Sequence, residues 1–92
     1  YLSEEERKAA LSLSKAVKLG ISMAEAGEKS ALRITEAMTQ VVEEEPLAKI
    51  DYIKAVNAHS IEPVSEMSGE VLVAMAVYIG KTRLIDNFIF KS

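Results

Sequence analysis

The sequence predicts an α+β domain of two layers, in which two helices pack on one face of a three-stranded antiparallel β-sheet. Three observations predict it: two stretches with helical periodicity come first, a strand-like stretch follows, and an apolar hairpin comes last. Residues 71–79 carry no charge and are rich in β-branched side chains. A strand that is apolar on both faces needs cover, so we expect residues 71–79 in the middle of the sheet.

The turn of the hairpin is indicated by Gly80 and Lys81, which follow the apolar strand at once. Glycine suits the first position of a two-residue turn between antiparallel strands. Residues 82–90 are therefore predicted to return alongside residues 71–79.

A capping box opens the first helix. The Ser3 hydroxyl is placed for the amide of Glu6, and the Glu6 carboxylate reaches back. The helix is predicted to begin at Glu4 and to end near Gly27, because glycine favours a helix C-terminus. Leu11 lies outside the apolar stripe, either as an ordinary exposed leucine or as a contact with a missing domain or partner. The stripe consists mostly of small residues that allow a close helix contact: Ala9, Ala10, Leu13, Ala16, Val17, Gly20 and Ala24.

The middle of the chain holds a second helix and, after it, the one predicted strand that precedes the hairpin. Ser30 can cap the helix, and Pro46 prevents its continuation. Residues 49–56 are predicted as an edge strand, since they carry charged side chains that must reach water. The polar connection at residues 57–69 follows, in which Ser60 can cap a single helical turn.

Composition bounds the function. The 92 residues form one domain, residues 1–92, with a net charge of −3. A phosphate-backbone binder needs clustered Lys and Arg, so we expect no nucleic-acid partner. No run of about 18 apolar residues is present, so we expect no membrane partner. The chain has no cysteine, which fits a reducing compartment, and we expect a cytoplasmic protein.

We predict no catalytic, no cofactor-binding and no metal-binding residue in this chain. His59 with Glu62 and Glu66 could form a proton relay or half a metal site, but a ligand set needs further convergent groups, so we interpret His59 as a surface loop residue. The glutamates at 43–45 are consecutive and point in different directions, which favours a solvated helix end.

Two further patterns resemble catalytic motifs only superficially. Ser12 and Ser14 are interpreted as helix-surface serines without a neighbouring base. The Gly-Lys-Thr at residues 80–82 lacks the upstream glycine and loop of a phosphate-binding site. It is interpreted as the hairpin turn.

Polar residues in the last strand have a structural interpretation. Arg83 and Asp86 are expected to pair with Asp51 and Lys54 across the sheet, or to satisfy neighbouring backbone groups. We favour these contacts over a catalytic role.

Four segments together resemble the C-terminal domain of pantothenate synthetase. They are Leu-Ser-Glu-Glu-Glu-Arg at residues 2–7, Ile-Asp-Tyr-Ile at 50–53, Ile-Glu-Pro-Val at 61–64 and Gly-Lys-Thr-Arg-Leu-Ile-Asp-Asn at 80–87. They occur in the family's order, and the likeness runs over residues 1–87. Each segment alone is a weak signal, but the ordered set makes an accidental likeness improbable.

The resemblance implies part of an ATP-dependent ligase that joins pantoate and β-alanine. ATP and magnesium serve the parent enzyme, whose catalytic residues lie mainly in an N-terminal nucleotidyltransferase domain. That domain is the implied partner, and the C-terminal domain is a hinged lid. The family's ATP-contacting segment is expected to end just before Tyr1, so no catalytic residue carries over and the isolated domain is expected to be inactive.

Two other functions remain open: a self-contained homodimerising interaction module, and a small-ligand-binding regulatory domain. Two helices shield only one face of the sheet, so we expect the other face to be bare and to mediate self-association in the isolated domain. The bare set is one of two alternating sets in the central strand: Val71, Val73, Met75 and Val77, or Leu72, Ala74, Ala76 and Tyr78.

Overall fold

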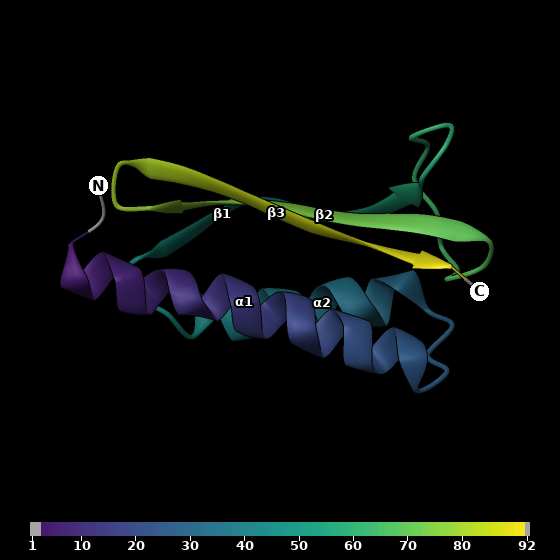
Figure 1. Ribbon diagram of the computed structural model, residues 1–92, viewed down its shortest axis with the longest axis horizontal. Coiled ribbons are helices and arrows are strands. Elements are labelled where there is room, and N and C mark those ends of the chain that lie inside the picture. The colour runs from purple at the N-terminus through teal and green to yellow at the C-terminus, as the bar shows by residue number, and fades with distance from the viewer. Residues whose placement is uncertain (1–2, 92) are drawn as a thin grey trace.

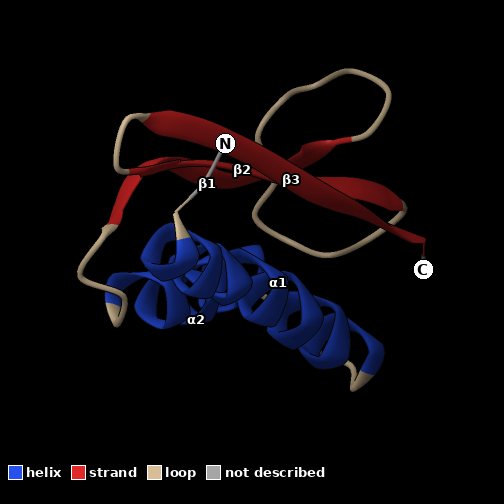
Figure 2. Cartoon of the chain, turned by 60° about the vertical axis from the view of Figure 1, so that its left-hand side comes forward, coloured by secondary structure: helices blue, strands red, loops and turns tan. Residues whose placement is uncertain are grey.

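The computed structural model describes residues 3–91, which fold into two layers (Figure 1). One layer holds the helices α1 (Glu4–Glu25) and α2 (Ala31–Glu43). The other is an antiparallel sheet of β1 (Ala48–Asn57), β2 (Glu70–Ile79) and β3 (Thr82–Lys91). Figure 2 shows both helices on one side of the strands, so the predicted α+β architecture is confirmed. Neither helix is long and apolar enough to cross a membrane.

The predicted capping box starts α1. The Ser3 amide donates to Glu6 Oε1 over 3.0 Å, and the Glu6 amide donates to Ser3 Oγ over 3.1 Å. The hydrogen bond from the Ser3 backbone amide is the main cause of the lowered pKa of Glu6, and the Ser3 side chain lowers it further. The helix begins at Glu4 as predicted, and Gly27 follows its end with a φ of 101°.

Small residues bring α1 close to the rest of the core. Ala9, Ala16 and Gly20 are all buried. A Cβ placed on Gly20 would lie 2.8 Å from Met38 Sδ of α2 and 2.9 Å from Phe88 Cε2 of β3. Gly20 therefore lets α1, α2 and β3 meet at one point, which confirms the close contact expected from the small-residue stripe.

The interpretation of Ser12 as a surface residue is wrong. Ser12 is only 8% exposed, and its hydroxyl donates to the carbonyl oxygen of Ala9 over 2.6 Å. A serine that satisfies its hydroxyl within its own helix can lie in an apolar contact, so polarity alone misplaced it. Ser14 is half-buried, and Leu11 is exposed as its position outside the stripe predicts.

The central position of β2 is confirmed by the strand order β1-β2-β3. A two-residue turn at Gly80 and Lys81 connects β2 to β3. Of these two residues only Gly80 has a positive φ, 62°. The register between β1 and β2 shifts between Ile50 and Tyr52, which marks a bulge at Asp51.

The predicted helical turn capped by Ser60 is wrong. A single turn does form, but it lies earlier: the Ile61 amide donates to the Asn57 carbonyl oxygen over 2.8 Å. Asn57 Oδ1 also accepts the amides of His59 and Ser60, over 2.8 and 3.0 Å. Asparagine caps such turns because its side chain reaches the amides two and three residues ahead.

After this turn the chain returns along the free edge of β1. The Asn57 amide donates to the Glu62 carbonyl oxygen over 2.8 Å, and the Val64 amide donates to the Ala55 carbonyl oxygen over 3.2 Å. We call residues 57–66 the 57–66 loop. It lies at the opposite end of the domain from the start of α1 (Figure 1).

The two faces of the sheet differ in their cover. Val71, Val73, Met75, Val77 and Ile79 are fully buried, and they face the helices. Neither helix covers the other side, so the expectation of one bare face is confirmed. We call this side the outer face, and its residues on the paired strands are Lys49, Tyr52, Lys54, Val56, Glu70, Leu72, Ala74, Ala76, Tyr78, Arg83, Ile85, Asn87, Ile89 and Lys91.

Candidate functional site

A charged cluster lies at the turn end of the outer face. Arg83 of β3 donates to Asp51 Oδ2 of β1 through Nη2 over 3.0 Å and through Nε over 3.3 Å. The pairing of Arg83 with Asp51 confirms the sequence prediction. The two side chains reach across β2, where the small side chain of Ala76 is fully buried. The bulge at Asp51 marks the point where β1 contributes this carboxylate.

Tyr52 joins this cluster between two cations. Lys54 Nζ lies 4.9 Å and Arg83 Cζ 6.0 Å from the centroid of its ring, within reach of a cation–π attraction. The hydrogen bond to Asp51 raises the pKa of Arg83. Arg83 thus stays charged and Asp51 is already engaged, so the cluster suits recognition of a surface better than acid–base chemistry.

Of the two alternatives expected for Asp86, the structure shows the backbone contact and not a pair with Lys54. In register, Asp86 stands opposite Met75 on the helix-covered side, while Lys54 stands opposite Ala74 on the outer face. Residues three apart in a strand point to opposite faces, so Arg83 and Asp86 cannot share one network. Asp86 instead accepts the amide of Asn87 over 2.8 Å, the backbone contact that was the other expectation.

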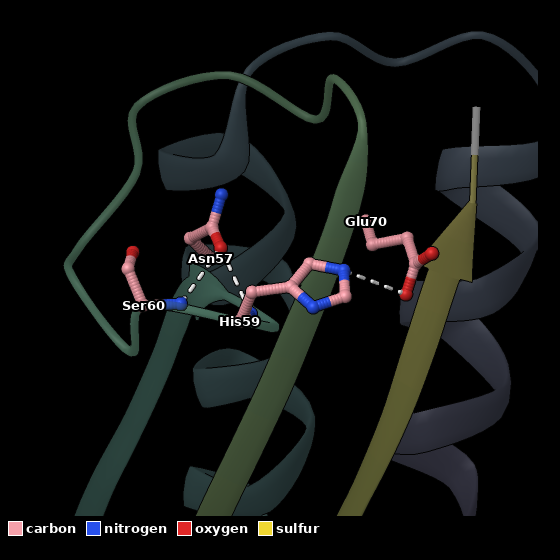
Figure 3. A network of polar contacts seen from close by, with 4 residues as sticks. All are labelled: Asn57, His59, Ser60 and Glu70. Carbon is pink, nitrogen blue, oxygen red and sulfur yellow. Dashed lines mark hydrogen bonds and ion pairs between the residues drawn. The ribbon is translucent and has the colours of Figure 1, made fainter.

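His59 lies at the start of the 57–66 loop (Figure 3). Its Nε2 atom is 3.3 Å from Glu70 Oε2, and the contact is an ion pair when the ring is protonated. The His59 side chain is largely exposed. Within residues 3–91, no hydrogen bond or ion pair joins His59 to Glu62 or Glu66. The sequence did not indicate Glu70 as the partner of His59, because the two residues are far apart in the chain. The fold brings them together, since the Ala58 amide donates to the Glu70 carbonyl oxygen.

The glutamates after α2 do not form a metal site. Glu45 Oε1 accepts the amide of Leu47 over 3.2 Å, and Glu43 and Glu44 are exposed. Within the described part of the chain, no group of three His, Cys, Asp or Glu side chains could hold a metal ion.

The turn after β2 does not fit a nucleotide phosphate. A Cβ on Gly80 would collide with the carboxylate of Glu6. A carboxylate packed against the turn repels an anion, whereas a phosphate loop presents free amides and a lysine. The interpretation of residues 80–82 as a hairpin turn is confirmed.

A shallow hollow lies between the start of α2 and β1. Its volume is about 320 Å³, and its walls include Leu32, Thr35, Ile53 and Val64. Among the described residues, no buried side-chain polar atom lacks a partner. Lys54 and Ser65 also line the hollow, so its walls combine apolar and polar side chains.

Large apolar side chains are exposed at several separate places. Ile61 in the 57–66 loop has a φ of 62°, and it is the one non-glycine residue with positive φ among residues 3–91. A β-branched residue rarely adopts that conformation, so the sequence did not indicate it. The exposed set comprises Leu11, Leu32, Leu47, Ile61, Tyr78, Ile85 and Ile89.

Comparisons with known proteins agree with this fold. The family model described as pantoate-beta-alanine ligase matches residues 1–89. The pantothenate synthetase of Clostridium botulinum (strain Okra / Type B1) is 47% identical over 91 residues, which is 99% of this chain and 32% of that protein. That of Clostridium acetobutylicum is 51% identical over 88 residues, 96% of this chain and 31% of that protein. The chain thus spans about a third of the length of these relatives.

A solved structure gives the same result. The crystal structure of pantothenate synthetase from Thermus thermophilus superimposes with a TM-score of 0.86 at 28% sequence identity, over 96% of this chain and 32% of that one. Sequence and backbone therefore agree over nearly the whole chain. This chain belongs to the pantoate-beta-alanine ligase family.

Proposed function

We propose that this chain is the C-terminal lid domain of a pantothenate synthetase, and that an N-terminal nucleotidyltransferase domain is its partner. The observation that carries the proposal is that the relatives match 99% of this chain but only 32% of their own length. A domain that accounts for a third of such an enzyme is suited to an accessory task.

The proposed reaction of the whole enzyme has two steps. The carboxylate of pantoate attacks the α-phosphorus of ATP, which forms pantoyl-adenylate and releases pyrophosphate. The amine of β-alanine then attacks the acyl carbon, which forms the amide of pantothenate and releases AMP and a proton. We assign the nucleotide and its Mg²⁺ to the other domain, because neither the Gly80 turn nor the carboxylates described here fit them.

The task of a lid follows from the intermediate. An acyl-adenylate is open to attack by water, so the site must close before the amine reacts. A compact two-layer domain can exclude water without supplying an acid or base. The outer-face cluster of Asp51, Tyr52, Lys54 and Arg83 gives it a charged surface for contact. We further propose that the enzyme works in the cytoplasm.

The test compares the full-length ligase with a variant that lacks residues 1–92 of this domain. Removal is expected to lower pantothenate formation by on the order of 100-fold and to increase AMP release per pantothenate, because water replaces the amine. The 92-residue chain alone is expected to make no pantothenate. Stoichiometric binding of ATP to that chain at micromolar concentration, measured by calorimetry, would contradict the assignment of the nucleotide to the other domain.

A self-associating module is the second candidate function. Ile85 and Ile89 are 60% and 56% exposed and lie on the outer face of the edge strand β3. Asp86 lies on the helix-covered side of β3. A charge in this position hinders a β-strand of a second copy from pairing with the free edge of β3, so we expect any association to use the outer face. A monomer in sedimentation at millimolar concentration would remove this candidate.

A further inference from the structure

We propose that Ile61, at the tip of the 57–66 loop, is the apolar anchor that holds the closed lid against the body of the ligase. This inference rests on the proposed function and adds to it one docking residue. Its basis is that Ile61 combines a strained backbone, an exposed side chain and a rigid support.

Ile61 is not part of the hydrophobic core of the domain. A φ of 62° brings the Cβ of a β-branched residue close to its own backbone, so glycine or asparagine would fit better. The side chain is 59% exposed and lies outside the hydrophobic core cluster. Strain of this kind persists at positions that serve recognition or catalysis.

Hydrogen bonds hold the loop in this conformation. Asn57 contributes its side chain to the amides of His59 and Ser60, its carbonyl to the amide of Ile61, and its own amide to the carbonyl of Glu62. Figure 3 shows the side chains of Asn57 and His59 in this arrangement, with the His59 ring directed at Glu70. The backbone at Ile61 is thus held in place by hydrogen bonds, which lowers the entropic penalty of docking.

The occupant follows from the missing length. Relatives are about three times as long as this chain, so roughly two-thirds of such a ligase is available to meet the loop. The 57–66 loop lies at the far end from the start of α1 (Figure 1), where contact with the body restrains a lid most effectively. A single apolar side chain that enters a hollow on the body suits a contact that must also open.

The experiment uses the full-length ligase with Ile61→Asn, and Ile85→Asn as the matched control. Ile85 has the same side chain and is 60% exposed, but it lies in an extended strand on the outer face. The readout is AMP released per pantothenate formed at limiting β-alanine. Ile61→Asn is expected to raise this ratio by roughly threefold or more, because the lid stays open longer, and Ile85→Asn is expected to leave it unchanged.

A second measurement separates docking from folding. The thermal midpoint of the 92-residue chain with Ile61→Asn is expected to be no lower than that of the parent, since asparagine tolerates positive φ. A lower midpoint would overturn the strain argument. A ratio unchanged by Ile61→Asn but raised by domain removal would overturn the anchor alone, whereas a ratio unchanged by domain removal would overturn the proposed function.

Two further outcomes name a different occupant. If Ile85→Asn raises the ratio and Ile61→Asn does not, the outer face is the docking surface. If the 92-residue chain dimerises in sedimentation and Ile61→Asn abolishes the dimer, the occupant is a second copy. Either outcome overturns the assignment of Ile61 to the body of the ligase.

Discussion

Both faces of the sheet carry large apolar side chains, but only one of them is covered by helices. On the helix-covered side, Val73 and Met75 are fully buried, and at Gly20 there is no room for one more carbon atom. On the outer face, Ile85 and Ile89 remain exposed although their neighbours in β2 are apolar. Hydrophobicity alone therefore does not locate the core of this domain, since cover by α1 and α2 decides which apolar residues stabilise it.

The largest effect is expected where a core side chain is shortened. Met75→Ala should lower the free energy of unfolding by about 2–5 kcal/mol, because it leaves a cavity under the helices. Ile85→Ala on the outer face should lower it by less than about 1 kcal/mol. Urea unfolding measures both values, provided that the dependence of the unfolding free energy on urea concentration is the same in parent and variants. Equal losses at the two positions would show that the outer face is also part of a core.

The next effect tests the closest contact on the covered side. Gly20→Val should lower the free energy of unfolding by about 1–3 kcal/mol, because its side chain would overlap Met38 and Phe88. Lys15→Val, at an exposed position of the same helix, controls for the lower helix propensity of valine. If both variants lose the same amount, the crowding at Gly20 is not what limits substitution.

A smaller, pH-dependent effect is expected at the start of the helix layer. The pKa of Glu6 is lowered from 4.5, so its carboxylate stabilises the folded state above that pH, and the stabilisation is lost as the pH falls through the lowered value. Between pH 7 and pH 2, the thermal midpoint of the parent chain should therefore fall further than that of the Glu6→Gln variant. Glu5→Gln removes a neighbouring carboxylate outside the capping box and should behave like the parent. Parallel curves for the parent and Glu6→Gln would refute the capping contribution.

The smallest effect is expected on the outer face. Arg83→Met breaks the contact with Asp51, but both side chains are solvent-accessible, so the thermal midpoint should shift least of the four. The shift should vanish in about 1 M salt, where charges are screened beyond ~3 Å. Asp51→Asn should give the same salt dependence. A large loss that persists in salt would mean that this pair holds the fold.

Much of the fold follows from the sequence because local and periodic signals agree. The capping box at Ser3, the small-residue stripe of α1 and the Gly80 turn each have one dominant local cause. Ser12 was predicted on the surface because serine is polar, but its hydroxyl donates to the Ala9 carbonyl oxygen, which allows it to be buried. The turn capped by Asn57 was missed because Ser60 offers a similar signal nearby.

The candidate sites were less predictable because they depend on pairing between distant strands. The contact between Arg83 and Asp51 could be predicted, because opposite charges on one face of a sheet tend to meet, here across the intervening strand β2. The opposite orientation of Asp86 follows from the two-residue period of a strand, since it is three residues from Arg83. The partner of His59 needed the course of the loop. The strain at Ile61 has no signal in a single sequence, since isoleucine is normally read as a strand or core residue.

The elongated outline of the domain has a mechanical consequence. The domain measures 39 × 25 × 15 Å, and α1 begins at the opposite end of the long axis from the 57–66 loop (Figure 1). Pivoted at the start of α1, the domain is a lever arm: a rotation of roughly 20° would move the far tip by about 13 Å. Such a rotation needs only a few backbone torsions at the pivot, and the paired strands transmit it without bending. A small change at one end thus becomes a displacement larger than a side chain at the other.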